Sequence, residues 1–391
     1  MTSRERLMAV LQHKIPDRVP VSTYDMTGWH YDPRDEKKEE GLADYVKREI
    51  FTTYLTGWWN QEPSYQPLME YLRKNADCLY MTDVPMTNAY TARNTHIEQR
   101  KEGNSTYTRI TLTTPKGDLT QEFRVDKGVY TAWEIEHRIK DISDVEKYLS
   151  IPYEPVEPDV SHLKVQDEFI GEHGILLIDV PDPISDVFGL FDFQEFLLFA
   201  YSEEELMFKM LDKAFEEQYD FMERILKKGA GPLFRFSGPE VCTPPFLSNE
   251  YFEKYVVKYD KPLIRLIHDY GQYARIHAHG KVKTVMKYML DMETDATDPL
   301  EAPISGDLTL AEAKQICGDK MCLFGNIQLK DLETMPAGRM SEIVKRCVEE
   351  GKPGGNFVAL PTATPLNVPL SKRTEENFHI FVDTVLEYGK Y

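Results

Sequence analysis

Residues 273–280 read Tyr-Ala-Arg-Ile-His-Ala-His-Gly, and they lie between two segments of helical periodicity, at about 249–269 and 281–291. The short run 273–277 is typical of a buried strand, because it is apolar and too brief for a helix. A strand with a helix on each side predicts a strand–helix–strand unit, in which neighbouring strands run parallel.

The same alternation continues outward from this stretch in both directions. Strands are expected at 17–21, 76–82, 174–179, 232–237, 273–277, 295–298, 321–325 and 357–360. Further helices are expected at about 2–13, 42–55, 309–316, 338–350 and 373–388. Eight strands that alternate with helices predict an α/β fold, a (β/α)8 TIM barrel, as a single domain over 1–391. An open doubly wound sheet is the alternative, but no glycine-rich phosphate-binding motif follows any strand.

One segment departs from this rhythm. Between about 95 and 130 the residues alternate with a period of two and are rich in β-branched side chains, and the turn signal Pro-Lys-Gly-Asp occupies 115–118. This pattern predicts an antiparallel β-hairpin inserted into the barrel. A proline-rich connector follows at 150–160.

The amino-acid composition limits the kinds of molecule and surface that the protein is expected to bind. The chain has 46 Lys and Arg against 65 Asp and Glu, a net charge of −19, which disfavours nucleic acid and anionic membranes. The longest apolar run, 187–201, is interrupted by polar residues, and the N-terminus has no apolar signal core. Five dispersed cysteines do not form a disulfide framework. We therefore expect a cytoplasmic protein that binds small molecules.

In a TIM barrel the active site lies at the C-terminal ends of the strands. Applied to the expected strands, this rule selects the polar residues at or just beyond each strand end. They are Tyr24, Asp25, Asp179, Asp182, Glu240, His277, His279, Asn326 and Thr362. Asp179, Asp182 and Asn326 have an alternative role as turn residues.

His277 and His279 carry the most information. Residues two apart on a strand point to the same face, so both imidazoles would project together at the barrel mouth. Such a pair suits zinc when a third residue completes the set, and Glu240 on the neighbouring strand end is the best placed. The alternative is that the histidines hydrogen-bond substrate or backbone.

Several short motifs, in this order along the chain, resemble a known family. They are Thr2-Ser-Arg-Glu-Arg-Leu7, Pro16-Asp-Arg-Val-Pro-Val21, Thr114-Pro-Lys-Gly-Asp-Leu119, His277-Ala-His-Gly280, Asp298-Pro-Leu-Glu301, Gly325-Asn-Ile327 and Gly354-Gly-Asn-Phe-Val-Ala359. The chain resembles the uroporphyrinogen decarboxylase superfamily, in its cobalamin (corrinoid)-dependent methyltransferase branch. The resemblance implies a (β/α)8 barrel and methyl transfer with a corrinoid carried by a partner protein.

Departures from the family pattern narrow the function. Decarboxylases carry two arginines just after the first strand, whereas residues 22–29 read Ser-Thr-Tyr-Asp-Met-Thr-Gly-Trp here. Porphyrinogen decarboxylation is therefore disfavoured. Thiol-activating relatives hold zinc with a His-x-Cys pair and a later Cys. In this sequence the first position is His277, but His279 and Thr362 stand where those relatives have the two cysteines. A thiol acceptor is disfavoured as well.

The resemblance leaves two reactions. The favoured one moves a methyl group from a small methylated substrate, such as an aryl methyl ether, to the corrinoid of the partner (O-demethylation); the alternative moves it from a methylcorrinoid to tetrahydrofolate. We expect His277, His279 and Glu240 to be catalytic, with or without zinc. Tyr24, Asp25, Asp179, Asp182, Asn326 and Thr362 are expected to bind substrate. The oligomeric state is open, with a homodimer as one expectation.

Overall fold

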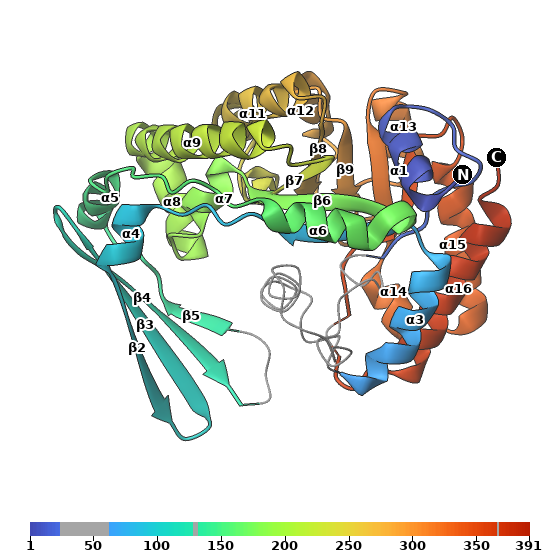
Figure 1. Cartoon of the computed structure of the whole chain (residues 1–391), viewed down its shortest axis with the longest axis horizontal. Helices are drawn as coiled ribbons and strands as arrows, with labels where there is room; N and C mark the ends of the chain where they lie inside the picture. The colour runs from blue at the N-terminus through green and yellow to red at the C-terminus, as the bar shows by residue number, and fades with distance from the viewer. Residues whose placement is uncertain (24–61, 128–131, 366) are drawn as a thin grey trace.

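A curled sheet of seven parallel strands forms the centre of the computed structural model (Figure 1). The structure describes residues 1–23, 62–127, 132–365 and 367–391. Adjacent strands in the sheet follow the chain order and are all parallel. They are β1 (Cys78–Asp83), β6 (Gly174–Pro181), β7 (Leu233–Ser237), β8 (Tyr273–Ala278), β9 (Ala296–Pro299), β10 (Cys322–Ile327) and β11 (Phe357–Pro361). The prediction of an α/β fold with a parallel sheet is confirmed.

The eighth predicted strand, around Val19, forms only two isolated bridges, and one of them joins it to the parallel sheet. Val21 pairs in parallel with Ala359 of β11, and its carbonyl accepts a hydrogen bond from the backbone N–H of Asp77, just before β1. Pro16 and Pro20 lack the N–H that a longer ladder requires. The described residues thus form a curled, TIM-barrel-like sheet whose edges are joined by this short segment, without the eighth strand of a closed barrel.

The described residues form fifteen α-helices, most of which follow the parallel strands and cover the outer face of the sheet (Figure 1). They are α1 (Ser3–Leu11), α3 (Gln66–Asn75), α4 (Ala89–Asn94), α5 (Ile142–Leu149), α6 (Ser161–Ile170), α7 (Pro183–Phe188), α8 (Phe193–Ser202), α9 (Glu204–Lys227), α10 (Asn249–Phe252), α11 (Lys258–Asp269), α12 (Met286–Asp291), α13 (Leu310–Cys317), α14 (Leu329–Thr334), α15 (Ala337–Gly351) and α16 (Lys372–Tyr388). The helix expected at 42–55 lies outside the described residues. Within the described ranges, no helix combines the length and the apolar character needed to cross a membrane.

The inserted segment is larger than the predicted hairpin. It forms a four-stranded antiparallel sheet that projects away from the parallel sheet, at the lower left of Figure 1. The strands are β2 (Thr95–Glu102), β3 (Ser105–Thr114), β4 (Gly117–Asp126) and β5 (Ala132–Glu136). The turn predicted at Pro115 joins β3 to β4. The outer strand β2 was missed as a strand because seven of its eight residues are exposed and most are charged or polar, so it lacks an apolar face.

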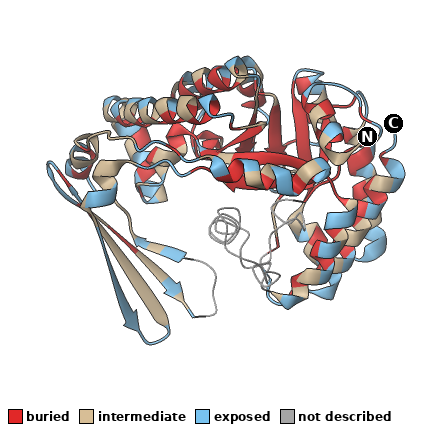
Figure 2. Ribbon diagram, in the orientation of Figure 1, coloured by how far each residue is buried: buried red, intermediate tan, exposed pale blue. Residues whose placement is uncertain are grey.

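The strands of the parallel sheet are buried almost throughout (Figure 2). Their side chains alternate between two faces of the sheet. The outer face packs against the helices and contains Tyr80, Ile178, Phe234 and Ile276. The inner face has an apolar lower part, at the N-terminal ends of the strands. This lower interior comprises Leu79, Ile175, Leu177, Leu233, Ala296, Cys322, Phe324 and Val358, packed with Leu7, Val10 and Leu11 of α1. Helix α1 therefore closes the interior from below, because its apolar side chains join this cluster.

Candidate active site

The inner face becomes charged toward the C-terminal ends of the strands. We call this region the upper interior; it comprises Asp179, Arg235, Arg275, His277 and Asp298. Strand register places Asp179 beside Arg235, Arg235 beside Arg275, and His277 beside Asp298. The Arg235 guanidinium pairs with Asp179, and Arg275 Nε lies 3.1 Å from Asp298 Oδ1. All four side chains are buried, and each charge has a partner of opposite sign, as burial requires.

His277 is a neutral imidazole of fixed orientation. Its Nδ1 lies 2.9 Å from Asp298 Oδ2. Burial, together with the positive charge of Arg235, lowers the pKa of His277 to about 3. Burial opposes ionisation of Asp298, but Arg275 and His277 outweigh it and hold the Asp298 pKa well below its usual range. The ionised carboxylate only accepts, so His277 donates from Nδ1 and is neutral at physiological pH.

His279 has the opposite protonation tendency, although it is only two residues away. Its Nδ1 lies 3.4 Å from Glu301 Oε2, which also accepts a hydrogen bond of 2.8 Å from the Gly280 N–H. Burial lowers the pKa of His279, but the carboxylates of Glu301 and Glu240 outweigh this effect and raise it. The two imidazole rings meet edge to face, with centroids 4.7 Å apart. A neutral and a readily protonated imidazole therefore stand side by side.

Glu240 faces the same region from the short 3-10 helix Pro239–Cys242, directly after β7. Its Oε2 is buried and has no hydrogen-bond partner among the described residues. Burial raises the pKa of Glu240, against the opposing effects of His279 and Arg235. The carboxyl is consequently a second group near His279 that is able to hold a proton.

The described residues do not fit a zinc ion at the predicted set of His277, His279 and Glu240. No three His, Cys, Asp or Glu side chains in the described part of the chain are arranged around one metal position. The Nδ1 atom of each histidine is engaged by a carboxylate, Asp298 or Glu301. Such carboxylates often orient metal-binding histidines, but the residues that the structure describes do not supply a third ligand.

The other predicted residues are placed differently. Asp182 is the N-cap of α7, where its side chain accepts a hydrogen bond from the Ser185 N–H, and it is fully buried. Asn326 donates from Nδ2 to the Leu300 carbonyl at 3.2 Å. The Thr362 hydroxyl is buried and accepts from the Leu329 N–H at 3.2 Å. Asp182 and Thr362 thus form hydrogen bonds within the protein, and their contact with substrate stays a prediction.

Two predicted residues, Tyr24 and Asp25, lie outside the described residues. Conversely, sequence reasoning missed Arg235 and Arg275 as part of the site. A signal for both was present, because Arg235 precedes Ser237 by two positions and Arg275 precedes His277 by two. Residues two apart share a face of a strand, so both guanidiniums had to point into the interior.

Comparisons with known proteins support the fold. Residues 186–388, more than half of the chain, match the protein-family model described as Uroporphyrinogen decarboxylase (URO-D). Among solved structures, a methyltransferase from Methanosarcina mazei is similar over 99% of each chain, with 15% identity and a TM-score of 0.59. A D-psicose 3-epimerase from Clostridium cellulolyticum H10 covers 54% of this chain and 87% of its own, with 7% identity and a TM-score of 0.31. No curated protein sequence matches the chain significantly.

Proposed function

The chain belongs to the uroporphyrinogen decarboxylase family, and we propose that it is a methyltransferase of this family. In this proposal it moves a methyl group from a small methylated substrate to the cobalt of a corrinoid that a partner protein carries. An aryl methyl ether is the model substrate. The similarity along the whole chain to a structure described as a methyltransferase supports the reaction class.

The observation that carries the proposal is the contrast between the two imidazoles at the end of β8. Breaking a carbon–oxygen bond to transfer a methyl group leaves an alkoxide or phenoxide, which departs readily only if its oxygen receives a proton. His279 is suited to give that proton, because Glu301 favours its charged form. His277 stays neutral and is suited to accept or orient a hydrogen bond without adding charge.

The reduced corrinoid supplies a nucleophilic cobalt that accepts the methyl group. The residues of this chain would bind the substrate and transfer the proton. In this proposal the substrate oxygen lies near the His279 ring, which gives up its proton as the bond to the methyl carbon breaks. Glu240, whose charge helps to raise the pKa of His279 and whose own pKa is raised by burial, is the group proposed to replace that proton. No step of this account uses zinc, because the described residues lack a three-ligand set.

The charges of the upper interior disfavour decarboxylation of a polycarboxylate. Arg235 and Arg275 are each paired with a buried aspartate. Residues 22–29 contain no arginine that would clamp further carboxylates. A substrate with several negative charges would therefore enter a site whose positive charges are already balanced, in a chain of net charge −19.

The test is methyl transfer to free cob(I)alamin, measured by the absorbance of methylcobalamin, with a panel of methoxylated aromatics as donors. We expect turnover by the wild-type chain and a loss of about 100-fold in kcat for His279→Gln, since a general acid typically contributes that much or more. His96→Gln is the matched control, because His96 Nε2 lies 3.3 Å from Glu98 on the exposed strand β2.

Two results would contradict the proposal. One is equal loss in His279→Gln and His96→Gln. The other is the absence of methylcobalamin with every donor, while methylcobalamin and tetrahydrofolate react together on the same protein. That second result would identify the alternative reaction, from a methylcorrinoid to tetrahydrofolate.

A further inference from the structure

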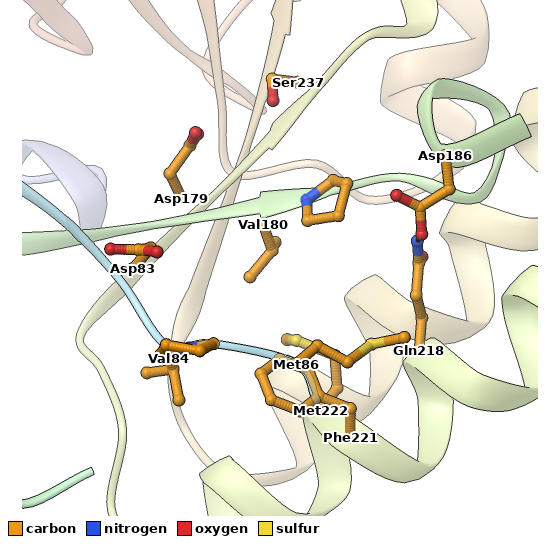
Figure 3. A pocket seen from close by; sticks show the side chains of 12 residues that line it. Asp83, Val84, Met86, Asp179, Val180, Asp186, Gln218, Phe221, Met222 and Ser237 are labelled. Atoms are coloured by element: carbon orange, nitrogen blue, oxygen red, sulfur yellow. Dashed lines mark hydrogen bonds between the residues drawn. The ribbon is translucent and has the colours of Figure 1, made fainter. Parts of the chain in front are cut away.

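A cavity of about 420 Å³ opens beside the upper interior, at the C-terminal ends of β1, β6 and β7 (Figure 3). Helices α7 and α9 form its far wall, through Asp186 and Gln218. Ser237, which lines the cavity, is the register partner of His277 on the neighbouring strand. The cavity therefore lies one strand away from His277, and it has room for one end of a small molecule.

Three carboxylates line this cavity, and two of them have no cationic partner. Asp179 is paired with Arg235. Within the described part of the chain, neither Asp83 nor Asp186 forms a salt bridge. Burial raises the pKa of both carboxyls, that of Asp186 to about 6. The protein thus places two largely uncompensated negative charges at one cavity, a costly arrangement without a positive ligand.

Gln218 adds an independent indication of a ligand. It is 3% exposed, and its Nε2 donates to Asp186 Oδ2. Its Oε1 is buried and has no hydrogen-bond partner among the described residues. A buried amide oxygen without a hydrogen bond raises the free energy of the protein. This atom is therefore a further acceptor that a ligand with a donor or a positive charge would satisfy.

The rest of the lining is apolar and polarisable. It comprises Val84, Pro85, Met86, Val180, Pro181, Phe221 and Met222. Methionine sulfurs and an aromatic ring interact favourably with the methyl or methylene groups around a cationic nitrogen. The lining therefore combines apolar side chains, which would contact methyl or methylene groups, with negative charge and hydrogen-bond acceptors.

We propose that this cavity binds an organic ammonium group of the substrate, such as a protonated or fully methylated amine. The inference rests on the proposed function, because it assigns the end of the substrate opposite the methyl group that is transferred. A pterin ring fits less well. Its ring N–H and amino groups are donors that carboxylates accept, but the ring is neutral and would leave the charges of Asp83 and Asp186 uncompensated. Tetrahydrofolate is therefore included in the test.

The test is binding of choline by calorimetry to the full chain, without any corrinoid. Its neutral isostere 3,3-dimethylbutan-1-ol serves as the comparison, because it has the same shape without the charge. We expect choline to bind at least about tenfold more tightly, and Asp186→Asn and Asp83→Asn each to weaken choline binding about tenfold while leaving the isostere unchanged. Glu205→Gln is the control, since it removes one charge from the exposed surface of the same helix α9 as Gln218.

Equal affinity for choline and the isostere in the wild-type chain would overturn the inference, and this comparison needs no variant to fold. Choline affinity that is unchanged in both aspartate variants would overturn it as well. So would binding of tetrahydrofolate that depends on Asp186 while no ammonium binds. Methyl transfer from methoxylated aromatics in a protein that does not bind choline would refute this inference alone. Choline binding without any methyl transfer would refute the proposed reaction alone.

Discussion

The lower and upper interior are formed by the same strands, but they are built from different chemistry. Below, side chains such as Leu177, Leu233 and Phe324 pack against α1 without a charged group. Above, each of two arginines is paired with a buried aspartate, and a histidine completes the cluster. One end of the sheet is stabilised by removing apolar surface from water, and the other contains charges that must compensate one another.

The two parts of the interior therefore differ in how substitutions should affect stability and function. Apolar packing is tolerant of position, because it depends mainly on volume and area. The stability of a buried charge depends on its ion-pair partner, because removing the partner leaves the charge buried and uncompensated. Substitutions should therefore affect stability in both halves, but should alter the protonation of the histidines only in the upper one.

The largest effect is expected for Asp298→Ala, which leaves Arg275 without its ion pair. Both side chains are almost fully buried. We predict a loss of about 3–5 kcal/mol in the free energy of unfolding, measured in urea. The double substitution Arg275→Met with Asp298→Leu removes both charges and should lose much less. A double variant that is as unstable as the single one would show that the pair itself, and not charge balance, stabilises the upper interior.

The next largest effect is expected from a substitution that creates a cavity in the lower interior. Leu233→Ala should cost about 2–5 kcal/mol in the free energy of unfolding, because the side chain is fully buried among apolar neighbours. The kcat of the folded variant should stay within about twofold of wild type, since no group near the histidines changes its charge. A tenfold loss of kcat in the folded protein would instead couple the two halves.

These two halves were not equally predictable. Seven strands were predicted from short buried runs such as 174–179, because the local sequence of a buried parallel strand is enough to identify it, without knowledge of the neighbouring strands. His277 and Asp179 followed from their places at strand ends. The pairing of Arg275 with Asp298 did not, because it depends on which strands are neighbours and in what register. Asp182 was expected to bind substrate, but a residue just after a strand is equally able to cap the next helix, and its sequence position does not distinguish these roles.

An uncompensated charge should make stability depend on pH. The pKa of Asp186 is raised to about 6 by burial, from 3.8. A raised carboxyl pKa stabilises the folded state at low pH, and this contribution is lost as the pH rises from about 4 to above 6. Asp186→Asn should remove about 2 kcal/mol of that decline between pH 4 and pH 7, measured by urea unfolding at both values. An unchanged decline in the variant would mean that Asp186 does not titrate there.

The smallest effect concerns the pairing of His279 with Glu301. Glu301 helps to raise the pKa of His279, so Glu301→Gln should lower it. A general acid works in its protonated form, and the rate is lost as the pH rises through its pKa. The alkaline limb of the kcat profile should therefore move to lower pH in Glu301→Gln, and the acid limb should not move. Glu98→Gln, beside the exposed His96, should leave the profile unchanged.

The two histidines at the end of β8 are expected to differ in their tendency to be protonated, and nitrogen-15 NMR of the imidazoles measures this difference directly. We predict that His277 stays neutral, with its proton on Nδ1, down to about pH 3. We also predict that His279 titrates above its ordinary value of 6.5. Titration of both rings together near 6.5, or a charged His277 beside a neutral His279, would refute this prediction.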